Sequence, residues 1–225
     1  MKAKHYFDPD PKIRKGLLQL NKKKDFIVLE KELEKQIIDF PNSSFLHNLK
    51  GACLSNQNRL EESIHSFNLS LKSAKNPAVI LNNIGVIQIK LNQFEDSIES
   101  FNKAIKSKPD YAEPYFNLGN ALRKLGRTKE SVDSYETACQ INPLYAKAFL
   151  YKSLSLKNLG KFEDSIISSK EAIKLKPDYG IAHRHLSSML TYIKKDDSHL
   201  EKMESVYKQE LINSEDRIQL AFGIG

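Results

Sequence analysis

The chain has 225 residues, and its 35 lysines and arginines outnumber its 28 aspartates and glutamates to give a formal charge of +7. An apolar content of 40% excludes an intrinsically disordered chain, and the Asn82-Asn83 interruption of the longest apolar stretch excludes a membrane span. Two cysteines, Cys53 and Cys139, without a CxxC pair exclude a disulfide framework and a cysteine zinc site, and they favour a reduced, cytoplasmic location.

A period of 34 residues runs through most of the chain. Several kinds of residue recur in register at this spacing, which indicates copies of one helix-turn-helix unit. The series are Gly51, Gly85 and Gly119, continued by Ser153; Ser63, Ser97, Ser131 and Ser165; Phe67, Phe101 and Tyr135; Asn58, Asn92, Gly126 and Gly160; and Pro109, Pro143 and Pro177. Counting in this period gives an N-terminal extension at 1–9, five units at 10–43, 44–77, 78–111, 112–145 and 146–179, a divergent sixth helix pair at 180–213, and the start of a further, truncated unit at 214–225.

The first two units depart from the pattern at single places. In the first unit Leu17 replaces the small residue, and in the second the proline comes two residues late, at Pro77. The third unit carries the full pattern. Gly85 lies inside its first helix, where glycine costs about 1 kcal/mol relative to alanine, so we expect two helices to cross too closely there for a larger side chain. Asn92 marks the reversal of the chain as a left-handed cap, and Pro109 ends the second helix.

The C-terminal residues keep the register only at first. His183, Leu186 and Leu190 fit a sixth first helix, after which the sequence leaves the register. Ser198-His-Leu-Glu201 then forms a capping box for a helix whose buried stripe is Leu200, Met203, Tyr207 and Leu211, and Ser214 begins another helix. The sequence stops inside that helix, so we expect the chain to be the N-terminal piece of a longer product.

The segment Tyr115-Phe-Asn-Leu118-Gly119-Asn-Ala-Leu122, with Ser131, Tyr135, Ala138 and Pro143, resembles the tetratricopeptide repeat (TPR). This resemblance covers residues 10–190 and implies an all-α, right-handed solenoid of antiparallel helix pairs, with a concave face built from the first helix of each unit. A second resemblance, carried by residues 182–187, 196–204 and 214–223, is to the junction after the repeats in bacterial TPR-containing sulfotransferases. It implies a catalytic domain beyond residue 225.

No residue pattern in the chain points to catalysis. It has no phosphate-binding loop, no HExxH and no GxSxG elbow, so we predict no enzyme activity and no cofactor. His183 and His185 lie two positions apart on a helix and point to nearly opposite sides, so we predict no metal site. Lysines are spread around the units and the densest run is Lys22-Lys-Lys24, which favours a solvated surface over a nucleic-acid site.

The expected concave face is lined by asparagines and basic residues, which suit an extended peptide. Asparagine side chains can pair with a peptide main chain, and a basic wall favours acidic side chains. The predicted peptide-groove residues are Asn48, Asn82, Asn83, Asn117, Asn120, Arg123, Lys124, Lys147, Tyr151, Lys157 and Arg184, with apolar contact from Val79, Val86, Ile89 and Phe116.

Three functions remain open from the sequence. The first is a non-catalytic protein–protein interaction scaffold that binds an extended, acidic or mixed peptide, without nucleic acid or membrane partners. The second is the substrate-recruiting arm of a sulfotransferase or other transferase. The third is self-association into a homo-oligomer through exposed solenoid ends, where Phe222 and Ile224 would lie.

Overall fold

The computed structural model of the protein describes residues 8–190, 198–209 and 212–224, and within these ranges it contains 13 helices and no strand. The helices are α1 (Pro11–Lys22), α2 (Phe26–Asp39), α3 (Ser44–Asn56), α4 (Leu60–Leu71), α5 (Ala78–Lys90), α6 (Phe94–Ser107), α7 (Ala112–Lys124), α8 (Thr128–Ile141), α9 (Ala146–Asn158), α10 (Phe162–Leu175), α11 (Gly180–Ser187), α12 (Ser198–Tyr207) and α13 (Ser214–Ile224). In these described ranges no helix combines the length and the apolar character that crossing a bilayer requires.

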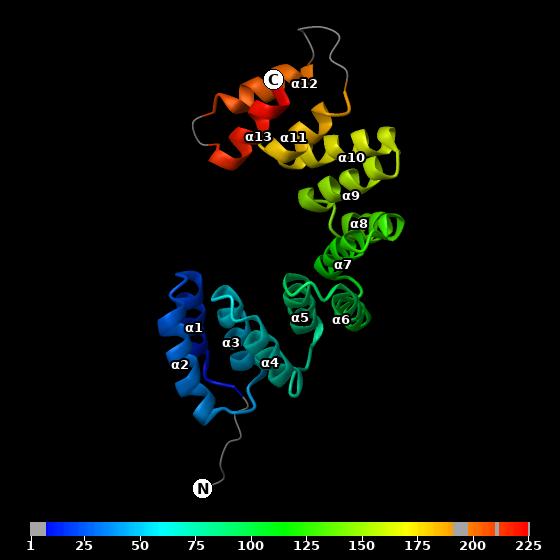
Figure 1. The fold of residues 1–225 in the computed structure, drawn as a ribbon. Coiled ribbons are helices and arrows are strands. Elements are labelled where there is room, and N and C mark those ends of the chain that lie inside the picture. The colour runs from blue at the N-terminus through cyan, green and yellow to red at the C-terminus, as the bar shows by residue number, and fades with distance from the viewer. Residues whose placement is uncertain (1–7, 191–197, 210–211, 225) are drawn as a thin grey trace. The chain divides into compact units, whose positions relative to one another are not determined.

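The helices pack as consecutive pairs within two halves, Met1–Pro109 and Asp110–Gly225 (Figure 1). The pairs α1/α2, α3/α4 and α5/α6 belong to the N-terminal half, and α7/α8 and α9/α10 belong to the C-terminal half. In α3/α4 the hydroxyl of Ser70, near the end of α4, donates to the Ser44 carbonyl at the start of α3, so the two helices are antiparallel. The all-α class and the antiparallel helix pairs of a TPR solenoid are thereby confirmed.

Left-handed residues close the turn inside each pair. Asn58 and Asn92 have φ of 61° and 59°, and Gly126 and Gly160 have φ of 75° and 73°. The N–H of the next residue then reaches back five residues, as from Gln93 to the Gln88 carbonyl at 2.8 Å, which satisfies a free carbonyl at the helix end. The predicted left-handed role of this series is confirmed. Asn and Gly adopt this backbone at the lowest cost, and Lys24, with a φ of 59°, takes the same place in α1/α2.

Glycines inside the first helices make room for aromatic rings of the second helices. A Cβ added to Gly85 would lie 2.6 Å from Cε1 of Phe101, and one added to Gly119 would lie 2.6 Å from Cε1 of Tyr135. Both rings are fully buried. The predicted close crossing is confirmed, and the space beside each glycine is filled by the aromatic residue of its own repeat.

In the helix pair α9/α10, polar side chains occupy the same crossing. Ser153 stands where α3, α5 and α7 have glycine, and Ser169 stands where α4, α6 and α8 have the aromatic ring. Their hydroxyls are 2.6 Å apart. Ser165 donates to the Ser153 carbonyl at 2.8 Å, so these buried hydroxyls are satisfied within one small network. Hydrogen bonds therefore replace ring packing in this pair.

The connection between α4 and α5 is longer than the other connections between pairs. It leaves the six residues 72–77 outside the helices, whereas α6 ends at Ser107 and α7 begins at Ala112, which leaves four. The whole repeat keeps its 34-residue length because α4 ends early, two positions before the place where the longer α6 ends. The longer connection accounts for the late position of Pro77 in the second unit.

In the C-terminal segment a buried carboxylate joins α13 to α11. Asp216 accepts hydrogen bonds from Asn213 Nδ2 at 2.7 Å, from the Gly180 main-chain N–H at 2.8 Å and from Lys176 Nζ at 3.0 Å. Burial alone would raise the pKa of Asp216, but these three donors lower it below its usual value. Asp216 therefore stays ionised at the start of α11 and satisfies a helix N–H that the repeat pattern leaves open.

The closest partner of α11 is α13, which differs from the helix pair predicted within residues 180–213. A Cβ on Gly180 would lie 2.2 Å from the Asp216 carbonyl oxygen, so glycine is what allows this approach. Farther along, Arg184 donates to Gln219 at 2.8 Å. The two helices therefore run side by side in the same direction, and α12 contacts α11 through the ring of His199 against His183.

Candidate functional site

Four aromatic rings gather around α7, α8 and α9 in the C-terminal half. The ring of Phe116 lies with its centroid 5.1 Å from that of Tyr145, 5.4 Å from that of Tyr151 and 5.7 Å from that of Tyr135. Phe116 is only 4% exposed, so its predicted role as an apolar contact for a ligand gives way to a role in packing. Tyr151 is half-buried and presents the accessible edge of this group.

Two cations lie over these rings. The Nζ atom of Lys147 is 5.3 Å from the centroid of Phe116 and 5.9 Å from that of Tyr151, and the guanidinium carbon of Arg123 is 5.5 Å from the centroid of Tyr151. Within the part of the chain that the structure describes, neither cation forms an ion pair with a carboxylate. Cation–π contact orients the two charges while leaving them without an anion.

An asparagine completes the site. The hydroxyl of Tyr135 donates to Oδ1 of Asn120 at 2.9 Å, which fixes the amide and leaves its two N–H donors for other partners. Burial raises the pKa of Tyr135 well above its usual value, so this hydroxyl keeps its proton and remains a donor. We call Phe116, Asn120, Arg123, Tyr135, Lys147 and Tyr151 the cation–aromatic cluster.

The other predicted groove residues of the C-terminal half do not join this cluster. Lys124 is exposed, and Asn117 is half-buried on the same helix, α7. Lys157 donates to the Ser188 hydroxyl at 2.7 Å. Arg184 is held by Gln219 and lies 5.0 Å from the ring of Phe222, because α13 packs beside α11. Lys157 and Arg184 are therefore occupied by contacts within the chain.

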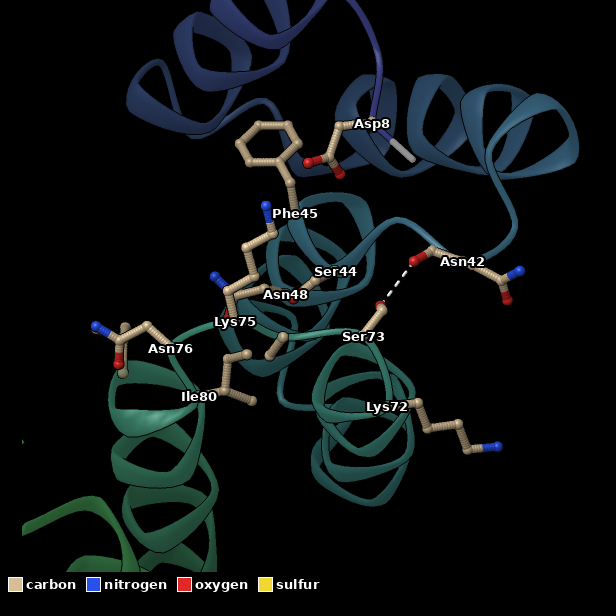
Figure 2. A pocket seen from close by; sticks show the side chains of 12 residues that line it. Asp8, Asn42, Ser44, Phe45, Asn48, Lys72, Ser73, Lys75, Asn76 and Ile80 are labelled. Carbon is tan, nitrogen blue, oxygen red and sulfur yellow. Dashed lines mark hydrogen bonds between the residues drawn. The ribbon is translucent and has the colours of Figure 1, made fainter. Parts of the chain in front are cut away.

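In the N-terminal half the predicted residues Asn48, Asn82 and Asn83 lie on α3 and α5. Asn82 is only 6% exposed, which leaves little of its side chain for a ligand, whereas Asn83 is half-buried. Asn48 lines a cavity of about 810 Å³ formed by α3, the start of α5 and the 72–77 connection (Figure 2). We call this the α3–α5 cavity.

Several site residues could not be found from the repeat pattern. Tyr135 and Tyr145 occupy ordinary packing positions, and only the fold brings them to Phe116. Lys75, in the 72–77 connection, also lines the α3–α5 cavity. The displaced Pro77 was the one available signal, because a late proline implies a longer connection after a shorter helix.

His183 and His185 are each held by contacts within the described part of the chain. His183 bonds the Pro177 carbonyl at 2.9 Å and contacts His199, whereas His185 faces Ser165 on α10. In the described ranges no group of three or more His, Cys, Asp or Glu residues is placed to hold a metal ion. Each histidine of the predicted non-metal pair therefore faces a different helix.

We expect both cysteines to resist thiol reagents in the folded protein. Cys53 and Cys139 are buried, and burial raises the pKa of Cys53 and raises that of Cys139 to about 12. Modification by a disulfide reagent at pH 8 should be about 100-fold slower in the native chain than in guanidinium chloride, because the thiolate is the reactive form. A fast, stoichiometric reaction of the native protein would contradict this.

Comparison with known families identifies the repeats. A family profile described as "TPR repeat" matches residues 85–126, and profiles described as "Tetratricopeptide repeat" match residues 112–145 and 146–179. A search of curated protein sequences gives no match.

Solved structures share the fold at low sequence identity. A structure of pilF from Pseudomonas aeruginosa has 12% identity and a TM-score of 0.77, and the match covers 93% of this chain and 95% of that one. MamA has 18% identity and a TM-score of 0.64, over 71% of this chain and 93% of its own. YrrB, described as a TPR protein with an unusual peptide-binding site, has 16% identity and a TM-score of 0.61, over 78% and 90%. With matched repeats over residues 85–179 and consecutive helix pairs in both halves, the chain is a tetratricopeptide-repeat protein.

Proposed function

We propose that the protein is a non-catalytic interaction scaffold that binds an extended, acidic peptide at the cation–aromatic cluster. The observation that carries this proposal is the pair of cations, Arg123 and Lys147, which lie over Phe116 and Tyr151 and form no ion pair with any carboxylate that the structure describes. The TPR fold, and its likeness to a repeat protein described by its peptide-binding site, support the class of partner.

The cluster offers each kind of contact that an acidic peptide needs. Lys147 is exposed and Arg123 half-buried, so a glutamate or aspartate can reach both without displacing an internal carboxylate. The Nε of Arg123 is buried without a hydrogen-bond partner in the described part of the chain, which a carboxylate oxygen or a bridging water would relieve. The N–H donors of Asn120, whose Oδ1 accepts from Tyr135, suit a main-chain carbonyl, and Tyr151 provides an apolar edge.

We expect Lys147→Glu to weaken binding of an acidic peptide by about tenfold, because reversal replaces an attraction with a repulsion at a partly exposed site. The probe is a blocked hexapeptide that alternates glutamate with leucine, measured by fluorescence anisotropy at low and at physiological salt. Arg123→Glu should act in the same direction, and added salt should narrow the difference between wild type and variant.

The matched control for this test is Lys129→Glu, which makes the same charge change at an exposed position of α8 outside the cluster. It should leave the affinity within about twofold of wild type, since exposed charges at a distance are screened. A second control is the hexapeptide with glutamine in place of glutamate. Equal affinity for both peptides, or equal losses in Lys147→Glu and Lys129→Glu, would count against the proposal.

The absence of catalysis, the cytoplasmic location, and self-association through Phe222 and Ile224 stay predictions. Phe222 is exposed on α13 beside Arg184. The resemblance to the junction of bacterial TPR sulfotransferases also stays a prediction, and the reading frame that follows the codon of residue 225 tests it directly.

A further inference from the structure

We infer that the α3–α5 cavity is a second binding site, which takes an extended peptide segment with an apolar side chain next to an acidic one. This site lies in the N-terminal half and shares no residue with the cation–aromatic cluster. The inference does not depend on the function proposed for that cluster.

The cavity lies where the chain departs from the repeat pattern. The helix α4 ends at Leu71, so residues 72–77 form the long connection to α5, and five of these six residues line the cavity. The same connection is four residues long after α6, α8 and α10. The chain thus provides here a wall of loop residues that its other repeats lack.

Apolar side chains form one part of the cavity wall. Phe45 at the start of α3 and Ile80 at the start of α5 line the cavity, together with Val79, whose side chain is 45% exposed. An exposed valine beside a half-buried aromatic ring leaves apolar surface in contact with water. Covering it with an aliphatic side chain removes this apolar surface from water, which favours binding.

A buried acceptor without a donor defines the polar contact. The Oδ1 atom of Asn48 is buried and has no hydrogen-bond partner in the described part of the chain. A buried carbonyl oxygen that lacks a donor is costly, and a ligand N–H relieves that cost. A peptide main chain supplies such an N–H, whereas a fatty acid supplies an apolar chain and a carboxylate but no donor.

The charges along the cavity select an acidic neighbour for the apolar side chain. Lys75 and Lys72 both line the cavity, and within the described ranges neither forms an ion pair. Figure 2 shows Lys75 on the side of the cavity where Asn48 lies, and Lys72 pointing away from it. The wall also holds one carboxylate, Asp8, which accepts a hydrogen bond from the Ser43 hydroxyl, so the two lysines leave the wall with a net positive charge. A ligand carboxylate therefore finds Lys75 as its partner.

The test is a nuclear magnetic resonance titration of the full chain with the blocked tetrapeptide Ac-Ala-Leu-Glu-Ala-NH₂. We expect shifts at the Asn48 side-chain amide and along residues 72–80. Glutamine in place of the glutamate should weaken binding about fivefold, and glycine in place of the leucine should do the same. These two comparisons use the wild-type protein and so do not depend on the stability of any variant.

Variants of the chain then locate the contacts. Lys75→Glu should weaken binding by about tenfold, while Lys72→Glu, the same charge change in the same connection, should weaken it by about twofold. Asn48→Leu removes the acceptor at similar volume and should weaken binding about fivefold. Lys129→Glu, the same charge change at an exposed position of α8 outside both sites, should bind the tetrapeptide like wild type.

Several results would overturn the inference. Octanoate binding as tightly as the tetrapeptide would identify a site for apolar anions instead. Shifts that spare Asn48 and residues 72–80, equal binding of the glutamate and glutamine peptides, or equal losses in Lys75→Glu and Lys72→Glu would each contradict the inference.

Discussion

Gly85→Ala is expected to lower the free energy of unfolding by about 2–3 kcal/mol. The added Cβ would lie 2.6, 2.8 and 2.9 Å from three atoms of the Phe101 ring. That ring has no exposed surface, so it cannot move aside without disturbing its own packing. The gain in helix propensity, about 1 kcal/mol, is smaller than this overpacking cost. Urea unfolding followed by circular dichroism measures the difference.

Gly16→Ala is the matched control, because it makes the same substitution inside a helix where nothing lies within 4 Å of the new Cβ. It should leave stability unchanged or raise it by up to about 1 kcal/mol. A double-mutant cycle with Phe101→Leu adds a direct test of contact, since a smaller partner should reduce the cost of Gly85→Ala. Equal and additive effects of the substitutions would show that the close crossing is not what requires glycine.

Acidification is expected to destabilise the C-terminal half through His185. Burial, together with the nearby charge of Lys157, lowers the pKa of His185 from 6.5 to about 4. Below pH 6.5 His185 is therefore protonated in the unfolded chain, but it stays neutral in the folded chain down to about pH 4. The free energy of unfolding therefore falls as the pH falls through this window. The loss amounts to about 2 kcal/mol at pH 5. Urea midpoints measured from pH 7.5 to pH 4.5 follow it.

His183 adds to the same acid sensitivity. Burial lowers its pKa, with a contribution from Lys202 and opposition from the Pro177 carbonyl and from Asp178 and Asp216. His185→Gln should flatten part of the pH dependence, whereas His65→Gln, at an exposed position on α4, should leave it unchanged. If His185→Gln and wild type lose stability in parallel between pH 6.5 and pH 4.5, carboxylates rather than this imidazole govern the response.

Much of the fold follows from the sequence because local rules repeat. Asn92 at a left-handed turn and Gly85 at a close crossing are positions where few residue types are tolerated, so the sequence reveals them directly. The hydroxyl network of Ser153 and Ser169 could not be read in this way. Ser153 fits the small-residue series like any other small side chain, and only the structure shows that its hydroxyl hydrogen-bonds to Ser169, 16 residues later.

The candidate site was predicted in part. The sequence supplied Asn120, Arg123, Lys147 and Tyr151 from the spacing of first-helix positions, and these four lie together in the structure. The sequence did not reveal the hydrogen bond from Arg184 to Gln219 of α13. The last helices depart from the 34-residue period, and their packing depends on long-range contacts such as that of Asp216 with Gly180. Periodicity thus predicts the regular helices and fails where tertiary contacts decide.

The glycine and the ring that fits against it belong to one repeat, as with Gly51 and Phe67 or Gly119 and Tyr135. A gene duplication that copies one repeat therefore copies both the glycine and the ring that packs against it. The new copy then needs no substitution in the neighbouring repeats to form this crossing. Within one repeat, a larger residue can replace the glycine only if a smaller residue also replaces the aromatic ring. The serine pair of α9/α10 is one such joint replacement.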